Sequence, residues 1–315
     1  MTPLHTRRRQ ISLLIITTGL ATAACRPSTR PSALQGQRCG VVGRAAIVSE
    51  ISDERIDELS GLVVSHTYPG VGWVHNDSGA DAVVYALDLA TGATIASYTL
   101  AGVEAIDWED IALAPADDGS GWDLYVADTG DNFQRRPFAV IYRIKEPAPS
   151  AGDHVIQEVE RMEVTYPSGP TNAECLAVDG DGALVIVTKP DGPTGEWMEV
   201  GAFIADGTVT ATPRGTIDLN ASTSGRENRS TGCDYEASTG RFVLRTYAHA
   251  FLVDGGPGAT LDQLTRAPSC VLELPPQEQG EAVAFDAHRP GVLLLASEET
   301  HQPLWAWTLE AGTPP

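Results

Sequence analysis

Five short segments of the sequence share one layout, in which a polar residue is followed by an apolar run and a turn. These segments start at Ser60, Glu109, Glu174, Thr231 and Glu281. A second apolar run follows each of them, and the loops after these second runs are rich in carboxylate and amide side chains. A tight turn between antiparallel strands places the start of the first strand beside the end of the second. We therefore expect the segment starts and these loops to meet at one edge.

Carboxylate and amide oxygens are the ligands that calcium, or magnesium with retained waters, prefers in proteins. We therefore expect a divalent cation, calcium or another, to bind where the polar starts of the segments meet the loops after the second apolar runs. The candidate metal ligands are Glu109, Glu174, Glu281, Asn76, Asp128 and Asn132. The alternative is that these polar side chains only hydrogen-bond the loops and face solvent. His75 and His249 lie in the same loops and are candidate general bases.

The repeated segments also predict the fold. The five starts lie 49, 65, 57 and 50 residues apart, which is close to the roughly 40–50 residues of a four-stranded propeller blade. The chain is therefore predicted to be all-β, a β-propeller of four-stranded blades. We expect five blades, or six if the 65-residue unit contains another. A two-domain β-sandwich is the remaining alternative.

The last repeat unit has only three strands. The apolar segment 43–48 has no blade of its own, so we expect this N-terminal strand to complete the last blade and close the ring. In a propeller the innermost strands line a central channel, which would bring Glu109, Glu174 and Glu281 to one mouth. Three carboxylates there repel one another unless they are protonated, paired with arginine or bridged by a cation.

Residues 1–24 have the layout of a signal peptide, with three arginines at positions 7–9, the apolar run ISLLIITTGL and then small residues. Cys25 follows two alanines and resembles the lipidation site of a bacterial lipobox. Residues 25–38 would then be a lipidated tether, rich in proline, serine and arginine, and residues 39–315 a single propeller domain. We expect an exported protein, anchored in a membrane by its lipid on the outer side of the cytoplasmic membrane or cell envelope. Export by the Sec or the twin-arginine route is left open.

Four further cysteines are Cys39, Cys175, Cys233 and Cys270. An even number in an exported chain indicates two disulfides. Cys39 lies just before the closing strand, and Cys270 begins the outer strand of the neighbouring blade, so a bond between them would hold the ring shut. Cys175 and Cys233 would then pair between the inner strands of the third and fourth blades.

Charge and motifs exclude several functions. The net charge is −21, which argues against nucleic acid as a partner because phosphate binding needs clustered basic residues. The sequence has no cysteine and histidine spacing of a zinc site. It also lacks a GxSxG nucleophile elbow, an HExxH motif and a glycine-rich phosphate loop.

From about residue 45 to 310 the chain resembles the NHL, SMP-30 and TolB-type propellers of exported bacterial proteins. The resemblance rests on the recurring Glu-x-[Ile/Leu/Val]-Ala start, the LYVADTGDN second strand and the VVYALDLATG third strand. Among such propellers, calcium-dependent lactonases and phosphotriesterases hold a metal on the channel axis through Glu, Asn and Asp. The resemblance implies that Glu109, Glu174 and Glu281 could match these ligands, with Asn76, Asp128 or Asn132.

Two functional hypotheses follow. In the favoured one, an anchored propeller binds a protein partner or small-molecule ligand through the loops at the channel mouth, around a divalent cation. In the alternative, the protein is a metal-dependent hydrolase of the lactonase or phosphoesterase kind, in which the metal polarises the substrate and activates water.

Overall fold

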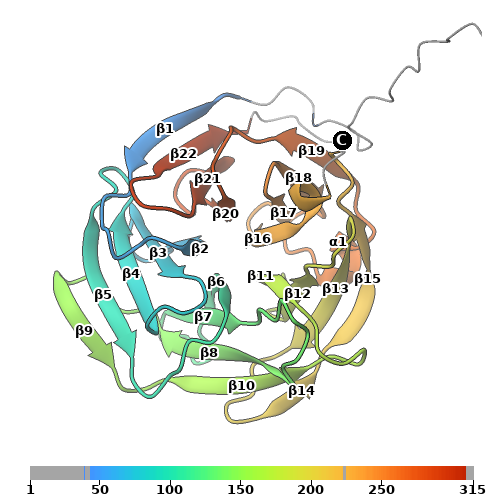
Figure 1. The fold of residues 1–315 in the computed structure, drawn as a ribbon, viewed down its shortest axis with the longest axis horizontal. Helices are drawn as coiled ribbons and strands as arrows, with labels where there is room; N and C mark the ends of the chain where they lie inside the picture. Colours follow the sequence, from blue (N-terminus) through green and yellow to red (C-terminus); the bar gives the residue numbers. More distant parts are fainter. Residues whose placement is uncertain (1–38, 40–42, 223–224, 310–315) are drawn as a thin grey trace, which may run out of the picture. The chain divides into compact units, whose positions relative to one another are not determined.

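The structure is a computed structural model that describes residue 39 and residues 43–222 and 225–309. The described residues form five sheets around a common axis, which is a five-bladed β-propeller (Figure 1). The prediction of an all-β propeller of four-stranded blades is therefore confirmed.

The four strands of each blade succeed one another outward from an inner strand at the axis. The first blade contains β2 (Leu59–Val64), β3 (Val71–Asn76), β4 (Val83–Asp88) and β5 (Thr94–Leu100). The second contains β6 (Trp108–Pro115), β7 (Trp122–Asp128), β8 (Ala139–Lys145) and β10 (Glu160–Thr165). The third contains β11 (Ala173–Val178), β12 (Leu184–Thr188), β13 (Thr194–Gly201) and β15 (Thr212–Asp218). The fourth contains β16 (Ser230–Glu236), β17 (Arg241–Thr246), β18 (His249–Asp254) and β19 (Ser269–Glu273). The fifth contains β20 (Gly280–Phe285), β21 (Val292–Ser297), β22 (Pro303–Thr308) and β1 (Ala45–Glu50).

Strand β1 closes the ring. It pairs with β22 in antiparallel register, from Ala45 opposite Trp307 to Glu50 opposite Pro303. The indole Nε1 of Trp307 also donates a hydrogen bond of 2.7 Å to the carbonyl of Gly43. The sequence-based prediction that an N-terminal strand completes the last blade is therefore confirmed, and blade five joins segments from the two ends of the propeller.

Two short strands add to the edges of preceding blades, and the first of them, β9, accounts for the long repeat unit. Strand β9 (Gly152–Ile156) follows β8 of the second blade but pairs in parallel with β5 of the first. Strand β14 (Thr208–Thr210) follows β13 of the third blade and pairs in parallel with β10 of the second. The extra length between Glu109 and Glu174 is thus an edge strand for the preceding blade, so the six-blade alternative is wrong.

The hydrophobic core lies between the blades rather than within one layer. Successive side chains of a strand point to opposite faces of its sheet, and both faces of each blade meet a neighbour. In β7, for example, Leu124 and Val126 pack toward the first blade, whereas Tyr125 and Ala127 pack toward the third. Five apolar clusters arise in this way, one at each blade–blade interface. This two-sided burial explains why the strands are continuous apolar runs in the sequence.

All five inner strands shift register by one residue near their first residue. The residue skipped by the pairing is the polar start of each repeat, namely Ser60, Glu109, Glu174, Thr231 or Glu281. Such a β-bulge inserts one residue opposite the partner strand and re-aims its side chain, and bulges are common beside functional sites. The polar starts are therefore equivalent positions around one end of the axis.

Two disulfides join neighbouring blades. Cys39 bonds to Cys270 of β19, at a sequence separation of 231 residues, beside the closing strand. Cys175 of β11 bonds to Cys233 of β16 and so joins the inner strands of the third and fourth blades. Both are the pairs expected from the sequence. Because disulfides persist in oxidising compartments, they indicate an extracytoplasmic environment.

Two short helical segments complete the described chain, the 3-10 helix η1 (Arg226–Asn228) and α1 (Leu261–Leu264). Within the ranges that the structure describes, neither of them has the length and apolarity needed to cross a membrane. The expected signal peptide (1–24), the tether (25–38) and the lipidation site Cys25 lie outside the described residues.

Candidate metal centre at the channel mouth

The hydroxyl members of the ring of polar starts hold blades together. The Ser60 hydroxyl donates a hydrogen bond of 2.6 Å to the carbonyl of Glu109 in the next blade. The Thr231 hydroxyl donates one of 3.1 Å to the carbonyl of Glu281, again in the next blade. These two hydroxyl groups are therefore used in hydrogen bonds to backbone carbonyls of the next blade. The three glutamates are the remaining ring members, and they are the candidates for binding a ligand or cation.

Glu174 is paired with a lysine. Lys189 follows β12 and donates hydrogen bonds from Nζ to Oε2 of Glu174 and, over 3.0 Å, to the hydroxyl of Tyr247. The amide of Asn172 donates to Oε1 of Glu174 over 3.3 Å. Burial raises the pKa of Glu174 to about 7, against the opposing effect of Lys189. Both carboxylate oxygens of Glu174 therefore have donors, and Lys189 is its counterion within the protein.

Lys189 is the cation that sequence reasoning did not assign. Burial disfavours its charged form, but the carboxylates of Glu174 and Glu281 outweigh burial and raise its pKa. Its position at the end of the second strand, directly opposite the start of the first, was the signal that could have identified it. Arginine was the protein cation expected as a partner for these glutamates, whereas Lys189 is the partner of Glu174.

Glu281 is buried between two cations. Burial and the charge of Glu174 raise its pKa well above the ordinary value, while Lys189 and Arg245 act in the opposite direction. Arg245 is itself fully buried and donates from Nη1 to the carbonyls of Ala282, at 2.7 Å, and Ala296, at 2.9 Å. Within the described residues, Oε2 of Glu281 has no hydrogen-bond partner. The carboxyl of Glu298 also forms a side-chain hydrogen bond with Glu281.

Glu109 belongs to a different group, which we call the acidic trio: Asp77, Asp107 and Glu109. One carboxylate oxygen from each of the three lies within 4.8 Å of the others. Glu109 is only 3% exposed, and among the described residues no hydrogen-bond donor reaches its carboxylate. Within those same ranges, the one donor to the trio's side chains is the backbone N–H of Ser78, which bonds to Asp77 at 2.5 Å.

The backbone of Gly130 lies directly against the carboxylates of Glu109 and Asp107, with no side chain between them. A Cβ atom at this position would lie 2.2 Å from Oε1 of Glu109 and 2.4 Å from Oδ2 of Asp107. Any larger residue would therefore displace the carboxylates. The loop after β7 is thus shaped to let the trio's oxygens approach each other, even though like charges repel.

The trio carries more negative charge than its surroundings balance. Burial raises the pKa of Asp77 to about 7, and nearby acidic groups add to the effect. Burial, followed by the charges of Glu174, Asp77 and Asp107, raises the pKa of Glu109 well above its ordinary value. Burial also raises the pKa of Asp107, against the field of Arg136. Protons or a bound cation would relieve this repulsion, so the trio fits a hard divalent ion.

The other predicted ligands have structural partners. Asp128 is fully buried, forms an ion pair of 2.6 Å with Arg136, and accepts hydrogen bonds from the N–H groups of Ile106 and Asp107. Its role is to hold the segment that carries Asp107. Of the six predicted ligands, only Glu109 lies in the trio.

The two predicted asparagines also bond to protein groups. Asn132 accepts a hydrogen bond of 3.3 Å from the amide of Asn172. Asn76 donates one of 2.7 Å to the carbonyl of Arg55, and its Oδ1 is buried without a partner among the described residues. Asp77 and Asp107 were not predicted as ligands. The signal was their adjacency, because Asp77 follows Asn76 and Asp107 lies two residues before Glu109.

The two candidate general bases are buried. His75 lies in β3 and not in a loop, its ring packs edge-on against Trp108, and Nδ1 lies 2.9 Å from the carbonyl of Asn76. Burial lowers its pKa to about 4. His249 begins β18 and is also buried. The position of His75 in the core does not suit a base that reaches a substrate.

A cleft of about 370 Å³ opens beside the Glu174 and Lys189 pair. Polar and apolar surface contribute about equally to its lining. The polar groups include those of Thr171, Asn172, Thr188, Lys189, Thr194 and Glu196. The cleft shares Asn172 and Lys189 with the hydrogen bonds of Glu174, so a ligand in it would contact the network at the channel mouth.

Comparisons with known proteins concern the fold alone. No protein-family model matches the chain, and no curated protein matches it either. Among solved structures, the PQQ-bound aldose sugar dehydrogenase of Streptomyces coelicolor aligns with a TM-score of 0.47 and 13% identity, over 85% of this chain and 98% of that one. A protein named as a gluconolactonase aligns with a TM-score of 0.46 and 12% identity, over 90% and 97%. Raptor of Chaetomium thermophilum aligns with a TM-score of 0.43 and 10% identity, and the match covers 89% of this chain but 30% of Raptor.

The pairing of Lys189 with Glu174 predicts a large effect of removing the cation. Lys189→Met leaves a buried carboxylate without a counterion, which should lower the free energy of unfolding by about 3–5 kcal/mol. The double variant Lys189→Met/Glu174→Gln removes both charges and should recover most of this loss. Urea unfolding at pH 8 measures both effects. A double variant as unstable as the single one would show that the loss is not electrostatic.

The raised pKa of Asp77 predicts a pH dependence. Because this pKa is about 7 in the folded protein and lower in the unfolded chain, the folded state binds the proton more tightly. The resulting stability is present at acidic pH and is lost as pH rises through about 7. In the presence of a chelator, the melting temperature should therefore fall between pH 4 and 7, and fall less in Asp77→Asn. Identical slopes for the two proteins would contradict this assignment.

Proposed function

We propose that this protein is an extracytoplasmic, membrane-anchored propeller that binds calcium at the acidic trio and uses the ion to hold a ligand at the channel mouth. The observation that carries the proposal is the carboxylate of Glu109. It is buried, it lacks a hydrogen-bond donor among the described residues, and it lies with two further carboxylates. Burying a charge is costly unless it is paired or coordinates a metal.

The chemistry of the trio favours calcium over softer metals. Its three side chains offer only carboxylate oxygens, and oxygen ligands suit calcium or magnesium, whereas zinc and copper favour nitrogen and sulfur. Calcium takes six to eight oxygen ligands. Three carboxylates leave positions for water and for oxygens of a ligand. A cation in this place would therefore serve as an attachment point as well as a counterion.

The surroundings suggest the character of the ligand. The cleft of about 370 Å³ near Lys189 supplies hydroxyl and amide groups. Ile106 directly precedes Asp107 and Phe133 directly follows Asn132, and these two residues are 51% and 79% exposed. Exposed aromatic rings are frequent anchors for partners. A ligand with oxygen donors for the cation and an apolar part for Phe133 fits this face.

The anchoring part of the proposal rests on the N-terminal sequence together with the disulfides. The two disulfides agree with an oxidising compartment. Cys25 would carry the lipid, and residues 25–38 would separate the propeller from the membrane. A single acyl chain binds membranes only weakly, so stable anchoring would require the multiply acylated cysteine typical of a lipobox.

Calcium-dependent melting tests the cation site. At calcium concentrations of roughly 100 times Kd, binding to the folded state contributes about 2.7 kcal/mol, which should raise the melting temperature by about 5 °C. Glu109→Gln should abolish this rise. The matched control is Asp191→Asn, which removes an acidic side chain that is 91% exposed and paired with Arg229, and it should retain the full rise.

The possible results distinguish calcium binding at the acidic trio from binding elsewhere and from no binding. No shift and no calcium in the purified wild-type protein would overturn the cation site. An equal shift in wild type and Glu109→Gln would place the ion elsewhere. With a confirmed shift, turnover of lactone or phosphoester substrates that Glu109→Gln loses would identify the protein as a hydrolase and not a binding protein.

Membrane fractionation tests the anchor. The wild-type protein should sediment with membranes and require detergent for release, and its mass should exceed that of the polypeptide from Cys25 by the bound lipid. Cys25→Ala should be released without detergent. Recovery of both proteins in the soluble fraction would contradict lipid anchoring.

A further inference from the structure

Asp110, the residue after Glu109, joins three blades through one carboxylate. Its side chain is almost fully buried. Oδ2 accepts a hydrogen bond of 2.8 Å from the N–H of Leu176 and one of 3.1 Å from the N–H of Cys233. Oδ1 accepts one of 2.9 Å from its own neighbour Ile111. The two long-range donors belong to β11 and β16, the inner strands of the third and fourth blades.

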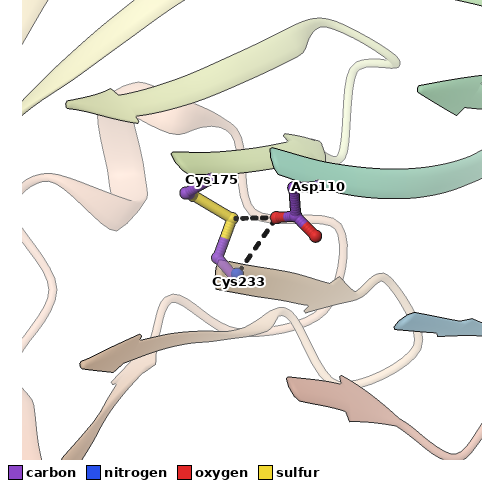
Figure 2. A group of neighbouring side chains, drawn as sticks. All are labelled: Asp110, Cys175 and Cys233. Atoms are coloured by element: carbon purple, nitrogen blue, oxygen red, sulfur yellow. Dashed lines mark hydrogen bonds between the residues drawn. A yellow bond between two sulfur atoms is a disulfide. The ribbon is translucent and has the colours of Figure 1, made fainter. Parts of the chain in front are cut away.

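The same two strands are joined covalently at this point. Figure 2 shows the side chains of Asp110, Cys175 and Cys233 converging from three strands. The disulfide links Cys175 to Cys233, and Sγ of Cys233 lies 3.7 Å from Oδ2 of Asp110. A sulfur in a disulfide has no proton to donate, so this is a packing contact. The carboxylate and the disulfide thus fix the second, third and fourth inner strands to one another.

This junction lies one residue from the channel mouth. Glu109 immediately precedes Asp110, and Glu174 immediately precedes Cys175. The position of the acidic trio relative to the Glu174 and Lys189 pair is therefore set by this junction. That spacing matters for cation binding, because an ammonium close to the trio repels a cation, whereas carboxylates held close together attract one.

We propose that Asp110, together with the Cys175–Cys233 disulfide, is a positioning device that sets the affinity of the acidic trio for its cation. This inference rests on the proposed function. Asp110 does not touch the ion. It holds Glu109 in place because Oδ2 accepts hydrogen bonds from the backbone N–H groups of two other blades, while Oδ1 accepts one from Ile111. An asparagine has a single side-chain oxygen, so it must give up either the bonds to the other blades or the bond from Ile111. Groups that orient metal ligands in this way typically contribute 10- to 100-fold to metal affinity.

The chain provides matched controls for both parts of the device. Asp234 of β16 is a second carboxylate that joins blades, since Oδ2 accepts a hydrogen bond of 2.7 Å from Phe285 and Oδ1 one of 2.8 Å from Tyr235. It lies three residues beyond the polar start Thr231, and so away from the mouth. The Cys39–Cys270 disulfide also lies away from the mouth, because it joins the outer strand β19 to the segment that precedes β1. Both should support stability without setting the geometry of the trio.

The experiment measures calcium affinity by calorimetric titration, and the melting temperature without calcium, on the full chain. The four variants are Asp110→Asn, Asp234→Asn, Cys175→Ser/Cys233→Ser and Cys39→Ser/Cys270→Ser. All four should melt at lower temperature. Asp110→Asn and Cys175→Ser/Cys233→Ser should raise Kd by about 10- to 100-fold. The two controls should stay within about twofold of wild type, as expected for distant sites.

Several results would overturn the inference. A calcium affinity in Asp110→Asn equal to that of wild type would overturn it. An equal loss of calcium affinity in Asp110→Asn and Asp234→Asn would also overturn it, because the loss would then follow from lower stability alone. If Asp110→Asn does not fold, the comparison of the two disulfide variants decides in the same way. A wild-type protein that binds no calcium would overturn the proposed function and with it this inference, whereas normal wild-type binding with an unchanged Asp110→Asn overturns only the inference.

Discussion

Negative charge gathered around a narrow axis is the constraint on which the rest of this structure depends. Five inner strands converge on that axis, and three of them carry, as their second residue, a glutamate that is almost fully buried. Charges of one sign in a poorly solvated place repel strongly. Lys189 compensates Glu174, and Lys189 and Arg245 together act on Glu281. Glu109 faces two more carboxylates instead. The channel mouth therefore divides into a neutralised side and an acidic side.

The scaffold that holds these charges is built from backbone and side-chain bonds between blades. A bulge at each polar start re-aims the residue, and hydroxyl and carboxylate side chains then accept or donate across the interface. Ser60, Thr231, Asp110 and Asp234 all act in this way. Each such bond connects groups separated widely in sequence, so the site is as rigid as the packing of the ring. Apolar clusters at every interface supply that rigidity.

The sequence predicts the parts of this arrangement that repeat. Regular spacing of apolar runs indicates the blades, the incomplete last unit indicates closure by β1, and closure then indicates which cysteines pair. What it does not predict depends on loops and on contacts between blades. The partner of Glu174 is Lys189, which comes after a different strand, and the companions of Glu109 come from two separate loops. A local sequence pattern does not show which residues from different strands and loops lie close together. The same holds for β9, whose pairing with β5 is visible only in three dimensions.

Strands β9 and β14 also affect how the propeller is assembled. Each is the outermost strand of a blade that the chain has already left, so the second blade cannot form fully before residues 208–210 are available. In repeat proteins whose units contact only their neighbours, stability is nearly a sum of local terms and a unit can be removed or duplicated. In this propeller the first blade receives β9 from the chain segment of the second, and the second blade receives β14 from the segment of the third. These three blades should consequently fold and unfold as one cooperative body, and blade number in this protein cannot change by simple loss or gain of a repeat.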